Sequence, residues 1–390
     1  MAVGSETMHR PGEAARLGSG RGKLTGGKRV LFLLLTNLFA FTIALLLAEV
    51  AFRLFWSPRY WIHCDRWLVG SGQTEVGKKW WPDTTYSVDG AEFSLRFQTN
   101  AAGYRARPEP VKPGPASRVA FVGDSFTEAM QVPYDSTFCA RLERLLNESD
   151  SSRRWVCENY GISATDLFDY WHRIIHDVLP VNPPDALVLC IYPGNDFQGL
   201  LPDDGFDVQG RPLRDYFRKP GWTKHLVAWI NLHSKFGMFL QRALLSWDAP
   251  SAHPRQGPKN WWTDPELAAR SADAPPVRRC QSLLRAIEQE CRRHGTKLCI
   301  LVVGPVANYV ARDGQSPLAR ILASWRIDVP VIDLAIQARA RRDWTTLVFP
   351  YDGHLNETGH AHLAQEAAAP LRAVLSNLGL TGVTKIQRGD

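Results

Sequence analysis

From residue 118 onward, short apolar runs alternate with longer segments of helical period, and this alternation restricts the folds open to the chain. The apolar runs read RVAFVGD, WVCENYG, ALVLCIYPGND, KLCILVVGP and PVIDL. The helical segments cover residues 137–147, 165–178, 277–294 and 357–375. Strands that alternate with helices form a parallel sheet with helices on both faces, and continuous apolar runs fit strands buried on both sides. We therefore expect a three-layer α/β/α domain with about five parallel strands.

A basic tail and a long uncharged segment precede this domain. Residues 1–29 carry six Lys and Arg against two Glu, which accounts for +4 of the formal net charge of +7. The nineteen residues 30–48 have no charge, and a helix of that length spans a bilayer. A cleaved signal peptide is the closest alternative, but Leu46 and Glu49 occupy positions where cleavage needs small residues. We expect a cytoplasmic tail over 1–29, a transmembrane anchor over 30–55 and an extracytoplasmic remainder.

Composition excludes several classes of protein. With 45% hydrophobic and 22% charged residues the chain is expected to fold, and most of its excess positive charge lies in the tail, so nucleic acid is not an expected partner. The seven cysteines are too few and too scattered for a disulfide scaffold, and no metal-binding spacing occurs. Cys190 and Cys299 lie in strand-like runs, where cysteine is usually a small buried side chain. We expect no metal and no cofactor.

Three of the expected strands end in residues that suit acyl chemistry. In open α/β sheets, ligands bind beyond the carboxyl ends of the strands. The first strand ends in GDSFT, which puts Ser125 at a strand-to-helix turn. The second ends at Gly161 and the third at Asn195, and a backbone N–H beside glycine or an asparagine amide can stabilise an oxyanion. Each of these residues, taken alone, is equally typical of a turn or a helix cap.

A fourth group precedes the last helical segment, in the sequence YDGHLNETGH. Asp352 stands two residues before His354, so its carboxylate can orient the imidazole while the other ring nitrogen accepts a proton from a serine. An Asp-Gly turn followed by Asn356 as a helix cap explains the segment by itself. It does not explain why a nucleophile, two oxyanion donors, a base and an orienting carboxylate occur together, which is the set required for acyl transfer.

The four motifs resemble those of the SGNH, or GDSL-like, hydrolases, which centre on Ser, Gly, Asn and His in that order. The resemblance extends over residues 118–375, about two-thirds of the chain. It implies that Ser125 is the nucleophile and that Asp352 and His354 are the orienting carboxylate and the base. It further implies an oxyanion hole made by the backbone N–H groups of Ser125 and Gly161 and the side chain of Asn195.

The sequence differs from many family members in one spacing, and it resembles some members in a segment outside the four motifs. Asp352 stands two residues before the histidine, whereas many family members have three, and the shorter spacing is also seen in relatives that acylate or deacylate polysaccharides. The segment FQTNAAGYRARPEP resembles the one that precedes the catalytic domain of bacterial membrane-anchored members. The substrate is therefore less defined by the motifs than the site is.

The resemblance and the sequence pattern together predict a domain layout. We expect an irregular lead-in over 56–117, a flavodoxin-like catalytic domain over 118–378 and a C-terminal tail over 379–390. Residues 197–276 interrupt the strand and helix alternation and are rich in tryptophan, so we expect an inserted cap there. Asp196 is expected to hold the loop that ends the third strand.

The expected function is a membrane-anchored serine esterase acting on acyl esters, O-acetyl esters in particular. An O-acyltransferase for cell-envelope polysaccharide is the nearest alternative, since the catalytic residues do not distinguish hydrolysis from transfer. A non-catalytic carbohydrate-binding scaffold is a third. His360 and His362 are read as packing or surface residues, and the glycosylation sequons at Asn147 and Asn356 as chance matches.

Overall fold

The computed structural model describes the chain from residue 26 to residue 379, with gaps. The residues outside its description are 1–25, 59, 65–72, 75–76, 110, 112–113, 150–152, 181, 195, 198–202, 215, 217–221, 249–260, 305–315, 335–343, 378 and 380–390. The chain divides into two compact units, residues 1–54 and residues 55–390. Each unit is described by itself.

The first unit contains one long helix, α1, over Gly26–Phe55. Its apolar side chains are exposed along its length, and by length and composition it could cross a membrane or serve as a signal sequence. The helix begins four residues before the predicted anchor and ends at the predicted residue. Glu49 and Arg53, four residues apart near its C-terminal end, form an ion pair with a distance of 2.6 Å.

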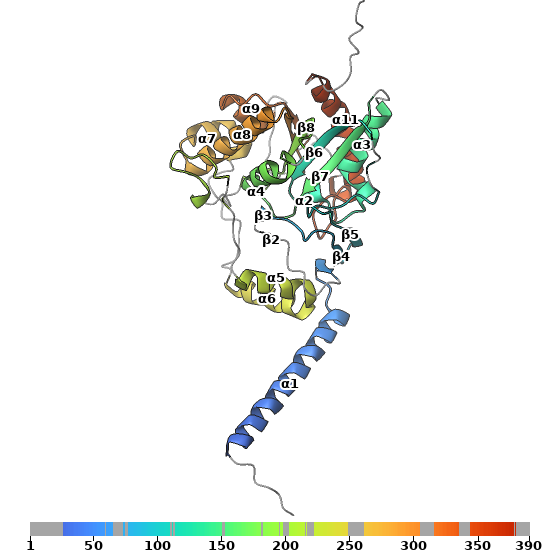
Figure 1. Ribbon diagram of the computed structural model, residues 1–390, viewed down its shortest axis with the longest axis vertical. Helices are drawn as coiled ribbons and strands as arrows, with labels where there is room; N and C mark the ends of the chain where they lie inside the picture. The colour runs from blue at the N-terminus through green and yellow to red at the C-terminus, as the bar shows by residue number, and fades with distance from the viewer. Residues whose placement is uncertain are drawn as a thin grey trace, which may run out of the picture. The chain divides into compact units, whose positions relative to one another are not determined.

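The second unit is built on a five-stranded sheet (Figure 1). Its strands are β6 (Ser117–Gly123), β7 (Trp155–Gly161), β8 (Ala186–Ile191), β9 (Lys297–Val302) and β10 (Val331–Asp333). All pairings are parallel, and the order is β10-β9-β8-β6-β7. Counted along the chain this is the 2-1-3-4-5 order of flavodoxin-like folds. The predicted fold class is therefore confirmed.

Helices cover both faces of this sheet (Figure 1). The helices α3 (Phe138–Ser149) and α11 (Glu357–Asn377) pack on one face. The other face is covered by α4 (Leu167–Arg173), α8 (Pro275–Arg293) and α9 (Pro317–Ser324). Along β6, Val119 and Phe121 face the first layer, whereas Ala120 and Val122 face the second. This alternation explains why the four consecutive residues 119–122 are all apolar.

The lead-in over 56–117, expected to be irregular, contains short antiparallel strands among its described residues. Strands β1 (Tyr60–Cys64), β4 (Thr85–Gly90) and β5 (Ser94–Gln98) form an antiparallel sheet, and β2 (Gln73–Thr74) pairs with β3 (Gly77–Lys78). Tyr86, Val88 and Phe97 from this sheet form a small core with Met130, which follows the short helix α2 (Ser125–Glu128). The strands are short and mix apolar with polar residues, so their periodicity is weak in the sequence.

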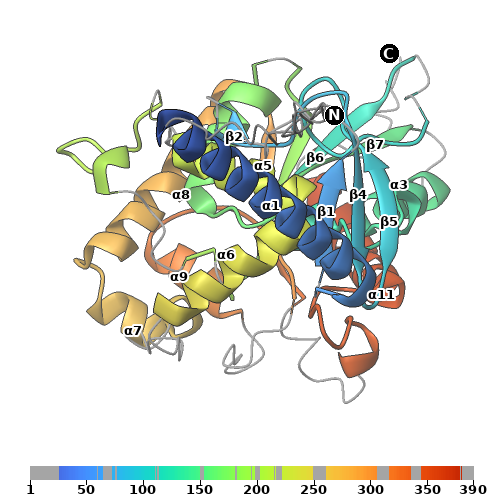
Figure 2. The same ribbon diagram turned by 90° about the horizontal axis from the view of Figure 1, so that it is seen from below.

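The interruption after the third strand also contains regular structure. It includes α5 (Trp222–His233), α6 (Lys235–Asp248) and α7 (Pro265–Arg270), besides short 3₁₀ turns. Trp261 and Trp262 are buried in the core of the second layer. Helix α5 contacts β1 (Figure 2). Leu232, near the end of α5, is buried in the lead-in core. The insert therefore packs partly on the main domain and partly on the lead-in sheet.

Candidate active site

Ser125 occupies the turn between β6 and the short helix α2 (Ser125–Glu128). Asp124 caps this helix, since its carboxylate accepts a hydrogen bond of 3.0 Å from the backbone N–H of Phe126. Gly123 is required immediately before it, because a Cβ there would come within 2.1 Å of Thr127 Oγ1 and 2.9 Å of Cys190 Cβ. The sequence GDSFT thus fixes a tight turn at the carboxyl end of β6.

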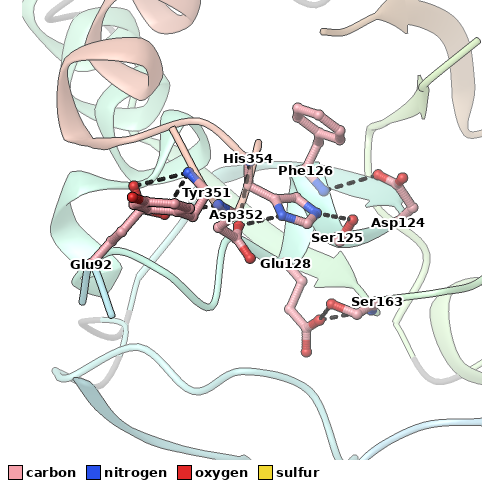
Figure 3. A network of polar contacts seen from close by, with 9 residues as sticks. All are labelled: Glu92, Asp124, Ser125, Phe126, Glu128, Ser163, Tyr351, Asp352 and His354. Atoms are coloured by element: carbon pink, nitrogen blue, oxygen red, sulfur yellow. Dashed lines mark hydrogen bonds and ion pairs between the residues drawn. The ribbon is translucent and has the colours of Figure 1, made fainter. Parts of the chain in front are cut away.

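The structure brings Ser125, His354 and Asp352 together in a line of hydrogen bonds (Figure 3). His354 Nε2 lies 2.7 Å from Ser125 Oγ, and His354 Nδ1 lies 2.5 Å from Asp352 Oδ1. The side chain of Asp352 is 1% exposed and that of His354 is 23% exposed. The carboxylate is therefore shielded from water, the serine is buried at 9% exposure, and the imidazole is the most exposed of the three side chains.

The loop that carries Asp352 and His354 is a tight turn before α11. Gly353 has a φ of +83°, a conformation that favours glycine, and its N–H donates to the carbonyl of Phe349 at 2.7 Å. Asn356 then caps α11 by accepting from the N–H of Gly359 at 2.9 Å. The turn and the cap are therefore present as the simpler interpretation of the sequence requires, and they coexist with the contact to Ser125.

Glu92, from the turn between β4 and β5, holds this loop from outside (Figure 3). Its carboxylate accepts hydrogen bonds from the backbone N–H of Tyr351, with both oxygens at 3.1 Å, and from that of Asp352 at 2.8 Å. Sequence analysis did not identify Glu92, because it lies 259 residues before Tyr351 and in no motif. Its contact fixes the backbone that presents the orienting carboxylate.

Arg105 binds the end of the short helix that begins at Ser125. Its guanidinium is buried and donates to the backbone carbonyls of Glu128, the last residue of α2, and of Ala129 and Val132, which follow it. Ala129 has a φ of +55° and ends the helix in the left-handed conformation, so its carbonyl is turned out of the helix. Burial lowers the pKa of Arg105 to about 10, which leaves it charged at neutral pH. A cation of the lead-in therefore binds the C-terminal end of α2.

The side chain of Glu128 completes this support. It is fully buried and accepts a hydrogen bond from the indole N–H of Trp80 in the lead-in. It also accepts from the N–H and the hydroxyl of Ser163 after β7 (Figure 3). The N–H of Ser163 lies 2.7 Å from the carboxylate. Glu128 thus joins α2 to the loop after the second strand of the sheet.

Of the two predicted oxyanion donors outside α2, Gly161 and Asn195, the structure describes only Gly161. The N–H of Gly161 donates to Asn159 Oδ1 at 2.8 Å, and a Cβ on Gly161 would come within 2.1 Å of the Glu128 nitrogen. Gly161 is thus required for close packing of α2 on β7, and its N–H has an acceptor within the protein. In this structure the N–H is bonded within the protein, and its use in an oxyanion hole stays a prediction. Asn195 lies outside the described residues.

Two other acidic side chains lie buried near Ser125. Burial raises the pKa of Asp124 to about 6 and that of Asp196 well above its usual range, and the nearby charge of Asp124 raises the pKa of Asp196 further. Asp196 accepts from the N–H of Tyr192 at 2.8 Å, which confirms that it holds the loop after β8.

His360 is buried, and its Nδ1 accepts from the N–H of Phe138 at 3.3 Å, so it is a packing residue.

Metal and thiol chemistry have no support within the described part of the chain. No group of three or more His, Cys, Asp or Glu there could hold a metal ion. All seven cysteines are free and buried.

No protein-family model and no curated protein sequence matches the chain. Among solved structures it is similar to a two-domain esterase (CEX) active on acetylated mannans, with 15% identity and a TM-score of 0.36 over 67% of this chain and 50% of that one. It is similar to the psychrotrophic esterase EstA from Pseudoalteromonas sp., with 11% identity and a TM-score of 0.38 over 67% and 100%. A third is a member of the lipolytic protein G-D-S-L family from Veillonella parvula, with 15% identity and a TM-score of 0.33 over 65% and 97%. The chain thus spans half of the first protein and nearly all of the other two.

Proposed function

We propose that the chain is a membrane-anchored serine esterase whose catalytic domain lies outside the cytoplasm. The observation that carries the proposal is the continuous contact from Ser125 Oγ through both nitrogens of His354 to Asp352 Oδ1. A helix cap and a turn require neither of these two hydrogen bonds. A nucleophile bonded to a base that is itself bonded to a buried carboxylate is the arrangement used for acyl transfer.

The reaction begins when Ser125 Oγ attacks the carbonyl carbon of an acyl ester. His354 Nε2 takes the hydroxyl proton as the new C–O bond forms, and it returns that proton to the alcohol oxygen as the ester bond breaks. Water then attacks the acyl-serine, His354 takes a proton from the water, and the carboxylic acid leaves as Ser125 regains its proton. Asp352 keeps Nδ1 protonated and stabilises the imidazolium that forms in each half-reaction.

The negative charge on the carbonyl oxygen needs hydrogen-bond donors. Ser125 is the first residue of α2, and the N–H groups of a first helical turn have no acceptor within the helix. This N–H and the side-chain amide of Asn195 remain the donors in the proposal. The loop after β7, where Ala164 adopts a φ of +55°, approaches α2 through Ser163 and is the place to search for a third donor.

The substrate is an acyl ester, and the proposal extends to O-acetyl groups on carbohydrate. The tail charges and the apolar helix α1 support an N-terminus in the cytoplasm and a catalytic domain on the other side. Protease added to spheroplasts should then degrade residues 56–390 and spare the tail. Full protection of the catalytic domain would contradict this topology.

The chemistry is tested with a fluorophosphonate probe, which labels activated serines. The full-length protein in detergent should be labelled at Ser125, and Ser125→Ala should remain folded and lose the label. Acetyl release from an acetylated ester should fall on the order of a millionfold, by the precedent of serine proteases. Labelling that survives Ser125→Ala would overturn the assignment. Addition of a sugar acceptor to the same assay separates hydrolysis from transfer, since transfer yields an acetylated sugar in place of acetate.

A further inference from the structure

The helices α5 and α6 form a hairpin whose exposed side chains are unusually apolar. Trp222 is 75% exposed and Leu226, one turn later on α5, is 47% exposed. On α6, Leu240 is 45% exposed and Leu244, again one turn later, is 61% exposed. Residues four apart lie on the same face of a helix, so each helix presents a row of large apolar side chains to solvent. We call these four side chains the apolar rows.

The hairpin is well anchored on its other side, so the apolar rows are not the result of a loosely attached segment. Leu232 of α5 is buried with Tyr86 and Val88 of the lead-in sheet. Asn231 Nδ2 donates to Gln241 Oε1 at 2.9 Å, which joins the two helices. The buried side of the hairpin thus already has its partner, and the apolar rows need a different one.

The hairpin is also tied to the first residues that follow α1. The ring of Trp56 lies edge-on to that of Phe239, with centroids 5.6 Å apart, and Lys235 Nζ donates to the Trp56 carbonyl at 3.4 Å. Trp61 Nε1 donates to the carbonyl of Asn231 at 2.8 Å. Trp56 follows Phe55, the last residue of α1, by a single peptide bond.

This connection determines which partner the apolar rows fit. If α1 spans a bilayer, its uncharged run ends at Ala48, and at 1.5 Å per residue Trp56 lies within about 12 Å of that point. The contacts of Trp56 then place the hairpin at the boundary between head groups and acyl chains. Amphipathic helices at this depth present Trp and Leu to the lipid, as the apolar rows would.

We propose that the α5–α6 hairpin is a second membrane contact, which inserts its apolar rows into the lipid–water interface on the catalytic side. This inference rests on the membrane anchor of the proposed function and adds to it a surface that sets the height and orientation of the catalytic domain. The interaction is with lipid acyl chains, and it requires no particular head group. A second copy of the chain, which would cover the same rows with protein, is an outcome that the test separates.

The test uses full-length protein in phosphatidylcholine vesicles with a thiol-reactive NBD fluorophore at one introduced cysteine. The seven native cysteines are buried, which favours labelling at the introduced site. Leu226→Cys and Leu244→Cys report on the apolar rows, and Val208→Cys is the matched control, since Val208 is 95% exposed and lies outside the hairpin. Quenching is measured with lipids that carry a doxyl group near the head group or near the chain end.

The expected result is a blue shift at both hairpin positions and quenching by the shallow doxyl lipid about twofold or more above that at Val208. A blue shift without lipid quenching would mean that protein covers the rows and would overturn the proposal in favour of a second copy. Spectra equal to those of the Val208 control would overturn it as well.

A fourth label separates this result from failure of the anchor. Leu38→Cys, in the middle of the uncharged run, should be quenched by the deep doxyl lipid if α1 spans the bilayer. Quenching at Leu38 without quenching at the hairpin rejects the hairpin contact alone. Absence of quenching at Leu38 rejects the anchor, and fluorophosphonate labelling of Ser125 in the same samples tests the esterase chemistry independently of both.

Discussion

The strand-end loops and the lead-in sheet both contact the catalytic residues, but over very different distances along the chain. Asp124 caps the helix that starts at the next residue, and Asp352 bonds an imidazole two residues away. The lead-in contributes Arg105, which donates to a carbonyl 24 residues later, and Glu92, which accepts from an N–H 259 residues later. The loops supply the reacting groups, and the lead-in holds the backbone on which they stand.

The difference separates two kinds of requirement. In the proposed mechanism Ser125, His354 and Asp352 take part in proton and bond transfer, so a change there should remove a step of the chemistry. Arg105 and Glu92 bind backbone groups, so a change there alters stability or the orientation of a group that remains present. If the comparison is right, variants of the two regions should fall into separate classes, with large losses of turnover in the first and losses of stability or modest losses of rate in the second.

The largest effect should come from the strand-end loop. Asp352→Asn keeps the shape of the side chain but removes the charge that holds Nδ1 of His354 protonated, so turnover should fall about 10⁴-fold by the precedent of serine proteases. The free energy of unfolding should scarcely change, because the asparagine oxygen can still accept from the N–H of His354. Turnover of an acetyl ester and urea unfolding of the same sample measure both quantities. A variant that loses stability and keeps turnover would make Asp352 a turn residue only.

Arg105 should show the opposite pattern. Arg105→Met leaves three backbone carbonyls and the buried Glu128 without their cation, which should lower the free energy of unfolding by about 3 kcal/mol. Arg107→Met is the matched control, since Arg107 pairs with Glu143 in a partly exposed ion pair and its loss should cost about 1 kcal/mol or less. Urea unfolding followed by circular dichroism compares the two. Equal losses of unfolding free energy in the two variants would show that the buried Arg105 contributes no more to stability than the partly exposed Arg107.

The same division explains what could be predicted from the sequence. The five strands are continuous apolar runs and the helices that cover them are strongly periodic, so the fold class followed from the pattern. Ser125, Asp352 and His354 lie in short motifs at strand ends, where fold and chemistry restrict the same few residues. Glu92 and Arg105 have no such signal, because their partners are backbone groups that any residue provides and that only the tertiary fold brings near.

Gly161 shows that a motif residue can be required for a reason other than the one that the motif suggests. Its place at the end of the second strand fitted an oxyanion donor, and glycine is indeed required there. The reason is the close approach of Glu128, however, and the N–H is bonded to Asn159. A sequence can thus identify a position where no side chain fits without identifying which backbone group approaches it.

A change at Glu92 should have a smaller effect, and it tests whether the lead-in positions the loop that carries Asp352 and His354. Glu92→Gln replaces one carboxylate oxygen with an N–H₂ group that cannot accept, so the backbone of Tyr351 and Asp352 loses part of its support. A shift of the imidazole by a fraction of an ångström should lower kcat about tenfold to a hundredfold, with KM unchanged. Glu266→Gln, at an exposed ion pair on α7, is the control that should leave both constants alone. An unchanged kcat in Glu92→Gln would show that the loop carrying Asp352 and His354 keeps its conformation without the Glu92 contacts.

The smallest expected effect concerns His360, at the place where the two regions meet. Burial, and secondarily the charge of Arg105 from the lead-in, lowers the pKa of His360 from its ordinary value of 6.5 to about 3. Between these values the unfolded chain binds a proton that the folded protein does not, so the stability that the neutral ring provides is complete above pH 6.5 and is lost as the pH falls. The loss should be about 1 kcal/mol for each pH unit below 6.5.

His360→Asn isolates this contribution, because the asparagine oxygen can still accept from the N–H of Phe138 but cannot titrate. Relative to the native chain, the variant should therefore gain stability as the pH falls from 6.5 to 5.5, by about 1 kcal/mol. The difference between the two chains must be measured, because the raised pKa of Asp124 acts with the opposite sign: below pH 6 the folded protein takes up that proton before the unfolded chain does. Urea unfolding at several pH values gives the two curves. Parallel curves over this range would mean that His360 is protonated in the folded protein, and that neither its burial nor the nearby Arg105 keeps it neutral.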